Sequence, residues 1–276
     1  MARFLAALFG TALYLAGQDA AEIVRRSVQA DQRTLEQAKD YTYQQSEVER
    51  NLDASGKVTS TESKTFDVLI LYGRPFRKLV AKDGKPLSAR EQAEQDSKLQ
   101  KEIDKRKRQS QQDIAKEERD AEKEQKDFRK VAGEIPNACI LTLIGQEQVA
   151  GRAAYVIKAE PRPGYKPTDS RIRFLSKMRG TLWIDKADYH WAKLEAEPTE
   201  TVSFGWVLAR ISPGTKIEVD QLRVNDEIWA PSHVRIKLDA RLALLKKFRK
   251  DIEISYSGYK KFKTDSRVVA VSESAP

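Results

Sequence analysis

The chain has 276 residues, of which 33% are charged, with a net charge of +9 and a single cysteine. This length is enough for one large domain or two small ones. One cysteine excludes an intrachain disulfide, and Cys139 opens an apolar run in which a buried thiol is expected rather than a reactive one. The positive net charge favours binding to an anionic surface or partner, but it does not distinguish among membranes, acidic proteins and nucleic acid.

The first residues are typical of a secretory signal peptide. Arg3 precedes an apolar run of about thirteen residues, Phe4 to Ala16, which is shorter than the roughly twenty residues that span a bilayer. We expect residues 1–17 to be the signal peptide, with an uncleaved membrane anchor as the alternative. Leu15-Ala16-Gly17 resembles the start of a bacterial lipobox, but Gln18 stands where the acylated cysteine would be. These features predict a periplasmic protein without a lipid anchor.

The next segment predicts a helix followed by β-strands. Asp19 to about Lys39 has a helical apolar stripe and an acidic N-cap. Tyr41 to about Leu52 alternates in the manner of a strand, and Asp53 to Gly56 is a turn signal. Val58 to about Lys78 predicts a further stretch of strand, in which Pro75 indicates a bulge or a strand change.

A long charged segment then interrupts the strands. Asp83-Gly84 predicts a hairpin, and Ser88 to Glu91 has the sequence of a capping box. From Ser88 to about Ala132, charged residues and glutamine dominate, and few large apolar residues occur. This composition predicts a solvated helix or helical hairpin with i,i+4 ion pairs, inserted into the sheet. A partner-binding or membrane-surface arm is the alternative, although the weak apolar stripe disfavours a membrane helix.

Strands return at Ile140 and continue almost to the end of the chain. Short apolar runs alternate with turn signals at Val149–Arg152, Pro161–Pro167, Asp185–Asp188, Ser212–Gly214, Asn225-Asp226 and about Leu244–Arg249. Closely spaced strands with short connections indicate an antiparallel sheet. We expect residues 267–276 to be a flexible tail.

The sequence carries no catalytic or metal-binding pattern. His190 and His233 are the only histidines, and neither lies in a Cys/His cluster. Asp185 and Asp188 flank a predicted turn, which explains them better than acid–base chemistry, and His190 is expected at a strand edge. Nucleotide-binding and nucleophile motifs are missing, and the basic residues are interleaved with acids. We therefore predict no enzyme, no cofactor, no metal and no nucleic-acid partner.

Aromatic residues of the predicted strands are the candidates for a binding site. Either they fill a core between sheet and helices, or some of them line an apolar cavity for an acyl chain. A curved sheet with helices against its concave face leaves room for such a cavity. The residues predicted to line it are Trp183, Trp191, Trp206, Trp229, Phe204 and Tyr155.

Three stretches of the chain carry motifs of a known family. Leu143–Ile157 is similar to a glycine- and arginine-containing hairpin of that family. Gly180–Asp185 with Tyr189–Glu195 is similar to its Leu-Trp-Ile-Asp strand–turn–strand. Glu227–Ser232, followed by Ile252–Tyr259, is similar to its Trp-x-Pro strand and final tyrosine-bearing strand. The family is the periplasmic lipoprotein-carrier superfamily, the LolA/LolB-like fold that includes the N-terminal domain of RseB/MucB proteins.

This resemblance implies an α+β fold: a strongly curved antiparallel β-sheet, or incomplete barrel, with helices against its concave face. Residues 18–266 would form this half-barrel as a single domain, with the long charged helical insertion of residues 88–132 inside it. The resemblance implies a non-enzymatic periplasmic carrier or sensor that holds a lipid or a lipoprotein acyl chain in an apolar cavity. The alternative is a regulatory module that binds an envelope protein without lipid cargo. An anionic membrane surface is a further expected partner.

Overall fold

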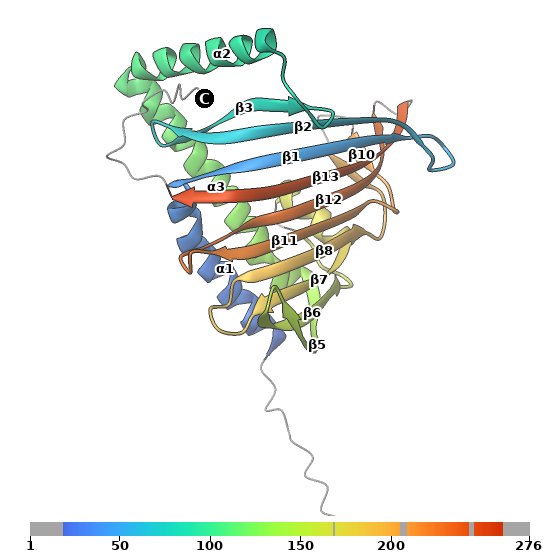
Figure 1. The fold of residues 1–276 in the computed structure, drawn as a ribbon. Coiled ribbons are helices and arrows are strands. Elements are labelled where there is room, and N and C mark those ends of the chain that lie inside the picture. Colours follow the sequence, from blue (N-terminus) through green and yellow to red (C-terminus); the bar gives the residue numbers. More distant parts are fainter. Residues whose placement is uncertain (1–18, 168, 205–208, 243–245, 262–276) are drawn as a thin grey trace, which may run out of the picture.

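The computed structural model describes residues 19–167, 169–204, 209–242 and 246–261 (Figure 1). The expected signal peptide, the C-terminal tail and Trp206 lie outside the described residues, as does part of the turn expected near Leu244. None of the helices in these ranges is long and apolar enough to cross a membrane.

The helices and strands of the described ranges follow the expected order, helix first and strands around a helical segment. The helices are α1 (Ala20–Ala38), α2 (Ala89–Lys107), α3 (Gln111–Ala138) and the 3-10 helix η1 (Ser170–Lys177). The strands are β1 (Tyr41–Leu52), β2 (Val58–Leu71), β3 (Arg74–Lys82), β4 (Lys85–Pro86), β5 (Cys139–Val149), β6 (Arg152–Pro161), β7 (Met178–Asp185), β8 (Trp191–Pro198), β9 (Val202–Phe204), β10 (Ala209–Ile211), β11 (Lys216–Val224), β12 (Ile228–Leu242) and β13 (Lys246–Lys261).

All the strands belong to one open antiparallel sheet. Its order is β4-β3-β2-β1-β13-β12-β11-β8-β7-β6-β5, and the short strands β10 and β9 branch from β12. β1 pairs with β13, so the first and last strands of the fold meet inside the sheet, while β4 and β5 end it. Helices α1 and α3 lie against one face of the sheet (Figure 1). This arrangement confirms the expected α+β fold with a curved, unclosed antiparallel sheet.

Two-residue turns with positive φ make most of the hairpins. Asp83-Gly84 and Asn225-Asp226 confirm predicted turns, because φ is positive at both positions, as the right-handed twist of paired strands requires. Tyr72-Gly73 is a turn of the same kind that the sequence analysis missed. The strand stretch expected from Val58 to about Lys78, with a bulge or strand change near Pro75, is thus two strands, and β2 ends at Leu71. Pro75 lies in β3, where it is paired with Ile70.

The charged segment forms two helices, as expected. Capping boxes at Ser88 and Ser110 begin α2 and α3. The side chain of Arg106 anchors α2 by donating to the backbone oxygens of Leu71 (2.8 Å) and Arg74 (2.9 Å) at the β2–β3 turn. Ion pairs from Lys78 to Asp96 (2.6 Å) and from Lys82 to Glu91 (2.9 Å) also join β3 to α2, so the helix is attached to the sheet by polar contacts while most of its charged residues stay in solvent.

Helix α3 continues past the expected end of the insertion at Ala132, because its last turns are apolar and pack into the core. Ala138 is buried together with Ile172 and Leu175 of η1, a helix that the sequence analysis missed. Ile135 of α3 packs on a second cluster, in which α1 covers β6 and β7. The core thus lies where α1, α3 and η1 meet the strands β5 to β7.

Candidate functional site

Two rows of directly paired side chains cross the helix-bearing face of the sheet, from β6 to β13. Cross-strand partners lie on the same face, so the pairing register places each row on one side. The first row is Ile157, Leu182, Leu194, Val219, Val234 and Ile254. The second row is Ala159, Gly180, Ala196, Ile217, Ile236 and Ile252. We call these the apolar rows.

Helices α1, α3 and η1 bury the β6 end of the apolar rows. Ile157 is 0% exposed and packs with Ile23 and Val24 of α1, and Ala159 is buried beneath the helices α3 and η1. We call the strands β5 to β7 beneath these helices the covered region. Along β8, β11, β12 and β13, which we call the open region, the row members remain partly exposed. From β7 to β13 these rows extend about 19 Å, at roughly 4.8 Å per strand.

The opposite face of the sheet is polar. Lys158, Thr181, Glu195, Glu218, Arg235 and Glu253 form a directly paired row there. Ion pairs join Arg235 to Asp251 (2.9 Å) and Arg50 to Glu253 (3.2 Å). Because this polar face is suited to water, the open region of the other face is the unusual surface of the sheet.

Gly180 lies where the covered and open regions meet. A Cβ atom added at this position would lie 2.3 Å from the backbone oxygen of Glu195. The missing side chain allows β7 and β8 to approach closely. The second apolar row therefore has small residues at Ala159, Gly180 and Ala196, and large ones only from β11 onward.

The apolar rows end at β1 in a group of polar and aromatic side chains. Ile254 is paired with Glu47, and Ile252 with Glu49. Glu49 forms an ion pair with Lys250, and Glu47 accepts a hydrogen bond from Arg77 (2.6 Å). A ligand lying along the rows would therefore be apolar over the open region and would meet hydrogen-bonding groups at β1.

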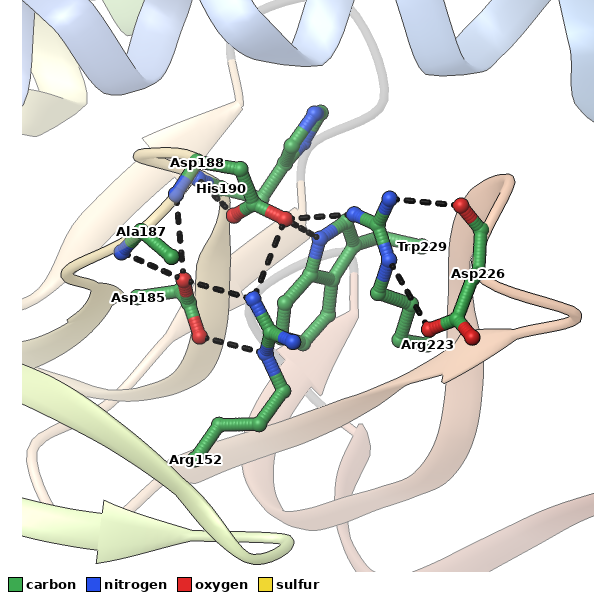
Figure 2. A network of polar contacts seen from close by, with 8 residues as sticks. All are labelled: Arg152, Asp185, Ala187, Asp188, His190, Arg223, Asp226 and Trp229. Carbon is green, nitrogen blue, oxygen red and sulfur yellow. Dashed lines mark hydrogen bonds and ion pairs between the residues drawn. The ribbon is translucent and has the colours of Figure 1, made fainter.

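A network of charged residues ties three hairpin ends together at one edge of the covered region (Figure 2). Arg152, next to the β5–β6 turn, donates to Asp185 at the end of β7 (2.6 and 3.0 Å). Asp188, in the β7–β8 turn, binds Arg223 of β11 and accepts from Trp229 Nε1 of β12 (3.0 Å). The two arginines thus hold adjacent hairpins in register.

Asp185 is the buried member of this network, with 1% of its surface exposed. Burial raises its pKa, but hydrogen bonds from Arg152 and from the backbone amides of Ala187 and Asp188 outweigh burial, so the pKa lies below the usual range. A carboxylate held in this way is ionised, and both of its oxygens accept hydrogen bonds. It supports the turn predicted for Asp185 and Asp188 rather than acid–base chemistry, and it also connects three hairpins, which the sequence did not indicate.

His190 directly precedes the first residue of β8, Trp191. Its ring is buried and stacks on Trp229 at 6.1 Å between centroids. Cys139 is buried as expected, and burial raises the pKa of its thiol. No group of three or more potential metal ligands occurs among the described residues.

The structure separates the aromatic residues predicted to line a cavity. Tyr155 is buried under α1, and Trp191 packs on the same cluster. Trp183 lies on the opposite face of the sheet, where it is buried with Ala154 and Val156 and its Nε1 donates to Glu147 (2.8 Å). Trp229 is part of the charged network described above. The backbone of Phe204 lies in β9, but its side chain, like Trp206, is outside the described part of the chain.

Sequence reasoning missed the aliphatic residues of the open region. The signal is present as alternation in three strands: Ile217 and Val219, Val234 and Ile236, and Ile252 and Ile254 stand between polar neighbours. This pattern predicts one apolar face for each strand. It does not indicate whether a helix covers that face.

No protein-family model matches the sequence, and no curated protein matches it either. Among solved structures, the chain is similar to a putative outer-membrane lipoprotein-sorting protein domain from Vibrio parahaemolyticus, at 11% identity over 91% of this chain and 96% of that chain, with a TM-score of 0.33. It is similar to a LolA superfamily protein from Nitrosomonas europaea at 10% identity over 90% and 94% of the two chains, with a TM-score of 0.30. A chain of the Pseudomonas aeruginosa MucA/MucB complex matches at 10% identity over 89% and 99%, with a TM-score of 0.25.

The names of these solved structures include the superfamily that the sequence motifs resemble. Identities of 10–11% and TM-scores of 0.25–0.33 carry no argument about function. The argument that follows rests on the residues of this chain.

Proposed function

We propose that the chain is a non-enzymatic periplasmic binding protein that carries or senses a lipid or an acylated ligand. The observation that supports this proposal is that the apolar rows remain partly exposed along the open region. A contiguous apolar surface of this width that stays partly exposed often marks a binding site. The signal-peptide pattern of residues 1–17 supports the periplasmic location.

Apolar burial would supply the affinity. Each methylene removed from water contributes about 0.8 kcal/mol, so ten methylenes contribute about 8 kcal/mol before the cost of association. An acyl chain laid across the strands would contact Leu194, Val219, Val234 and Ile254 in turn. Tyr155 and Trp191 would meet the end of the chain nearest α1.

Native mass spectrometry with lipid extraction tests this proposal. The protein to use is residues 18–276, purified from a periplasmic fraction. We expect a near-stoichiometric lipid or acylated species to co-purify. A mass without ligand that stays unchanged when lipids are offered would contradict the carrier function.

A pair of neighbouring substitutions makes the test specific to one face. Ile236→Gln places a polar group in the open region, whereas Lys237→Gln places the same side chain on the polar face, one residue away. We expect the first variant to lose most of the bound lipid and the second to keep it. Equal retention in both would place the ligand elsewhere.

The second candidate function is an envelope-protein interaction module, and the sheet edge at β5 favours it. In the described sheet β5 pairs only with β6, and Cys139–Gln146 carries no charge. Ile140 and Ile144 of this edge are 44% and 56% exposed. The other edge, β4, is two residues long and contains Pro86, which blocks strand addition.

An uncharged open edge can accept an extended segment of another protein by strand addition. Substituting Ile144→Lys tests this function, because a charge on the edge opposes pairing. A co-purified envelope protein that is lost in this variant, with lipid absent from both preparations, would favour the interaction module over the carrier.

A further inference from the structure

Three hydrogen-bond donors cluster where the apolar rows meet β1. Tyr256 follows Ile254 two residues along β13, and it is paired with Gln45 of β1. Tyr43 lies two residues before Gln45, with its ring centroid 5.9 Å from that of Tyr256. Arg77 of β3 reaches the same place. Both phenols and the guanidinium therefore stand at the end of the open region.

The two phenols have unused hydrogen-bonding capacity. Among the residues that the structure describes, neither the Tyr43 nor the Tyr256 hydroxyl makes a hydrogen bond. The neighbouring Tyr259 differs, because its hydroxyl donates to the backbone oxygen of Pro231 (2.6 Å). Burial raises the pKa of the Tyr43 and Tyr256 phenols, so each keeps its proton at neutral pH and can donate it.

The guanidinium of Arg77 is held in place and its charge is balanced. It lies over the ring of Phe66 at 3.9 Å and donates one N–H to Glu47 (2.6 Å). Glu47 also accepts from Gln45 (2.8 Å). The other N–H groups of Arg77 remain available, since its side chain is 45% exposed.

The cluster offers donors without a net positive charge. A neutral carbonyl oxygen can accept from the phenols and from Arg77 at little electrostatic cost. An anion would meet the carboxylate of Glu47 at the same place, and it would lose its hydration on entering.

We propose that Tyr43, Tyr256 and Arg77 bind the ester carbonyl of an acylated ligand, so that the site prefers an esterified acyl chain to a free fatty acid. This inference rests on the proposed function, because the acyl chain itself would lie on the apolar rows. It adds the polar end of the ligand and the direction in which the ligand lies, with the ester at β1 and the chain pointing toward β8.

A competition experiment with two probes of the same chain length tests the preference. Methyl palmitate and palmitate each displace a fluorescent acyl probe from the delipidated protein at neutral pH. We expect the ester to bind about tenfold more tightly, the size of one or two well-placed hydrogen bonds. The double variant Tyr43→Phe/Tyr256→Phe should lose that factor for methyl palmitate and keep its affinity for palmitate.

Two further variants sharpen the result. Tyr72→Phe is the matched control, because Tyr72 is exposed in the β2–β3 turn, and it should change neither affinity. Glu47→Gln leaves Arg77 without its carboxylate partner, so the preference should shift about tenfold toward palmitate. Solubility differences between the probes cancel when each variant is compared with the unmodified protein.

The outcomes separate the two proposals. Tight binding of both probes, with no change in the phenylalanine double variant, would overturn the ester site and leave the acyl-binding function standing. Binding of neither probe would overturn both.

Discussion

The covered and open regions share one pattern of side chains but differ in what lies over them. In the covered region, Ile157 and Ile184 are 0% and 1% exposed beneath α1. In the open region, the same rows continue through Val219, Val234 and Ile254, which stay partly exposed. The comparison shows that the alternation of side chains in a strand determines which face of the strand is apolar. Whether that face is buried depends on helices from other parts of the chain.

The two regions also differ in how charges are used. In the covered region, Arg152 and Asp185 form a buried link between hairpins. In the open region, Arg235 and Asp251 form a pair on the polar face, where the aspartate side chain is 14% exposed, compared with 1% for Asp185. Stability should therefore depend on the covered region, and ligand binding on the open one.

The largest expected effect compares the two ends of the apolar rows. Ile157→Ala should lower the free energy of unfolding by about 2–5 kcal/mol, because it leaves a cavity in packed surroundings. Ile236→Ala should cost no more than about 1–2 kcal/mol, since part of that side chain already meets water. Urea unfolding of the delipidated proteins measures both. Equal losses would mean that the open region is packed as tightly as the covered one.

The charged network gives the next comparison. Arg152→Met should cost about 2–4 kcal/mol, because it leaves the buried Asp185 carboxylate without its cation; solvent access to Arg152 keeps the loss below that of a fully buried pair. Arg235→Met removes the matched pair on the polar face and should cost about 1 kcal/mol or less. Thermal unfolding at neutral pH distinguishes them, and similar melting temperatures for the two variants would refute the structural role of the network.

Gly180→Ala tests the boundary between the regions. The new methyl group would meet the backbone oxygen of Glu195, so β7 and β8 must separate, at a cost of about 1–3 kcal/mol. Gly145→Ala is the control, because a Cβ there meets nothing within 4 Å. Chemical denaturation should show a loss for the first variant only.

Acid should weaken the covered region through Asp185. The pKa of Asp185 is lower in the folded than in the unfolded state, so the ionised carboxylate stabilises the fold at pH values above its ordinary pKa, near 4. This stabilisation is lost as the pH falls through the folded pKa. Asp185→Asn should therefore be less stable than the unmodified protein at pH 6, with a smaller further loss between pH 6 and pH 3. Unfolding midpoints at the two pH values provide the check; parallel pH profiles would contradict it.

The smallest expected effect concerns α2, which lies outside both regions. Ser88→Ala removes the cap of α2 and should cost about 1 kcal/mol. Hydrogen exchange should become faster in the first turns of α2 while the amides of β1 keep their protection. Loss of protection in both would show that α2 is coupled to the sheet more strongly than its side-chain contacts with β2 and β3 imply.

Much of the local structure could be predicted from the sequence. Turn residues such as Asp83-Gly84 and Asn225-Asp226 marked hairpins because few residues adopt positive φ, and the Ser88 capping box marked the start of α2. Tyr72-Gly73 was missed, because a tyrosine at positive φ gives little signal and Pro75 drew attention two residues further on. Each of these features depends on a few neighbouring residues.

The candidate site was harder to predict than the turns, because it depends on pairing between distant strands. Aromatic residues drew attention as large apolar groups, yet Trp183 is buried on the face opposite the apolar rows and Trp229 is part of the charged network. The aliphatic residues of β11, β12 and β13 acquire their meaning only when the register aligns them in rows.

The sequence by itself determined most of the helices and strands, the antiparallel character of the sheet and the apolar face of strands such as β11, β12 and β13, since these depend on local conformational preference and on the alternation of side chains. Only the tertiary structure decided that α1, α3 and η1 cover β5 to β7 and leave the apolar rows of β8 to β13 partly exposed. The physical reason is that cover comes from segments far away in the chain. The last turns of α3, which follow a long charged stretch, become core because the fold places them against η1 and β6.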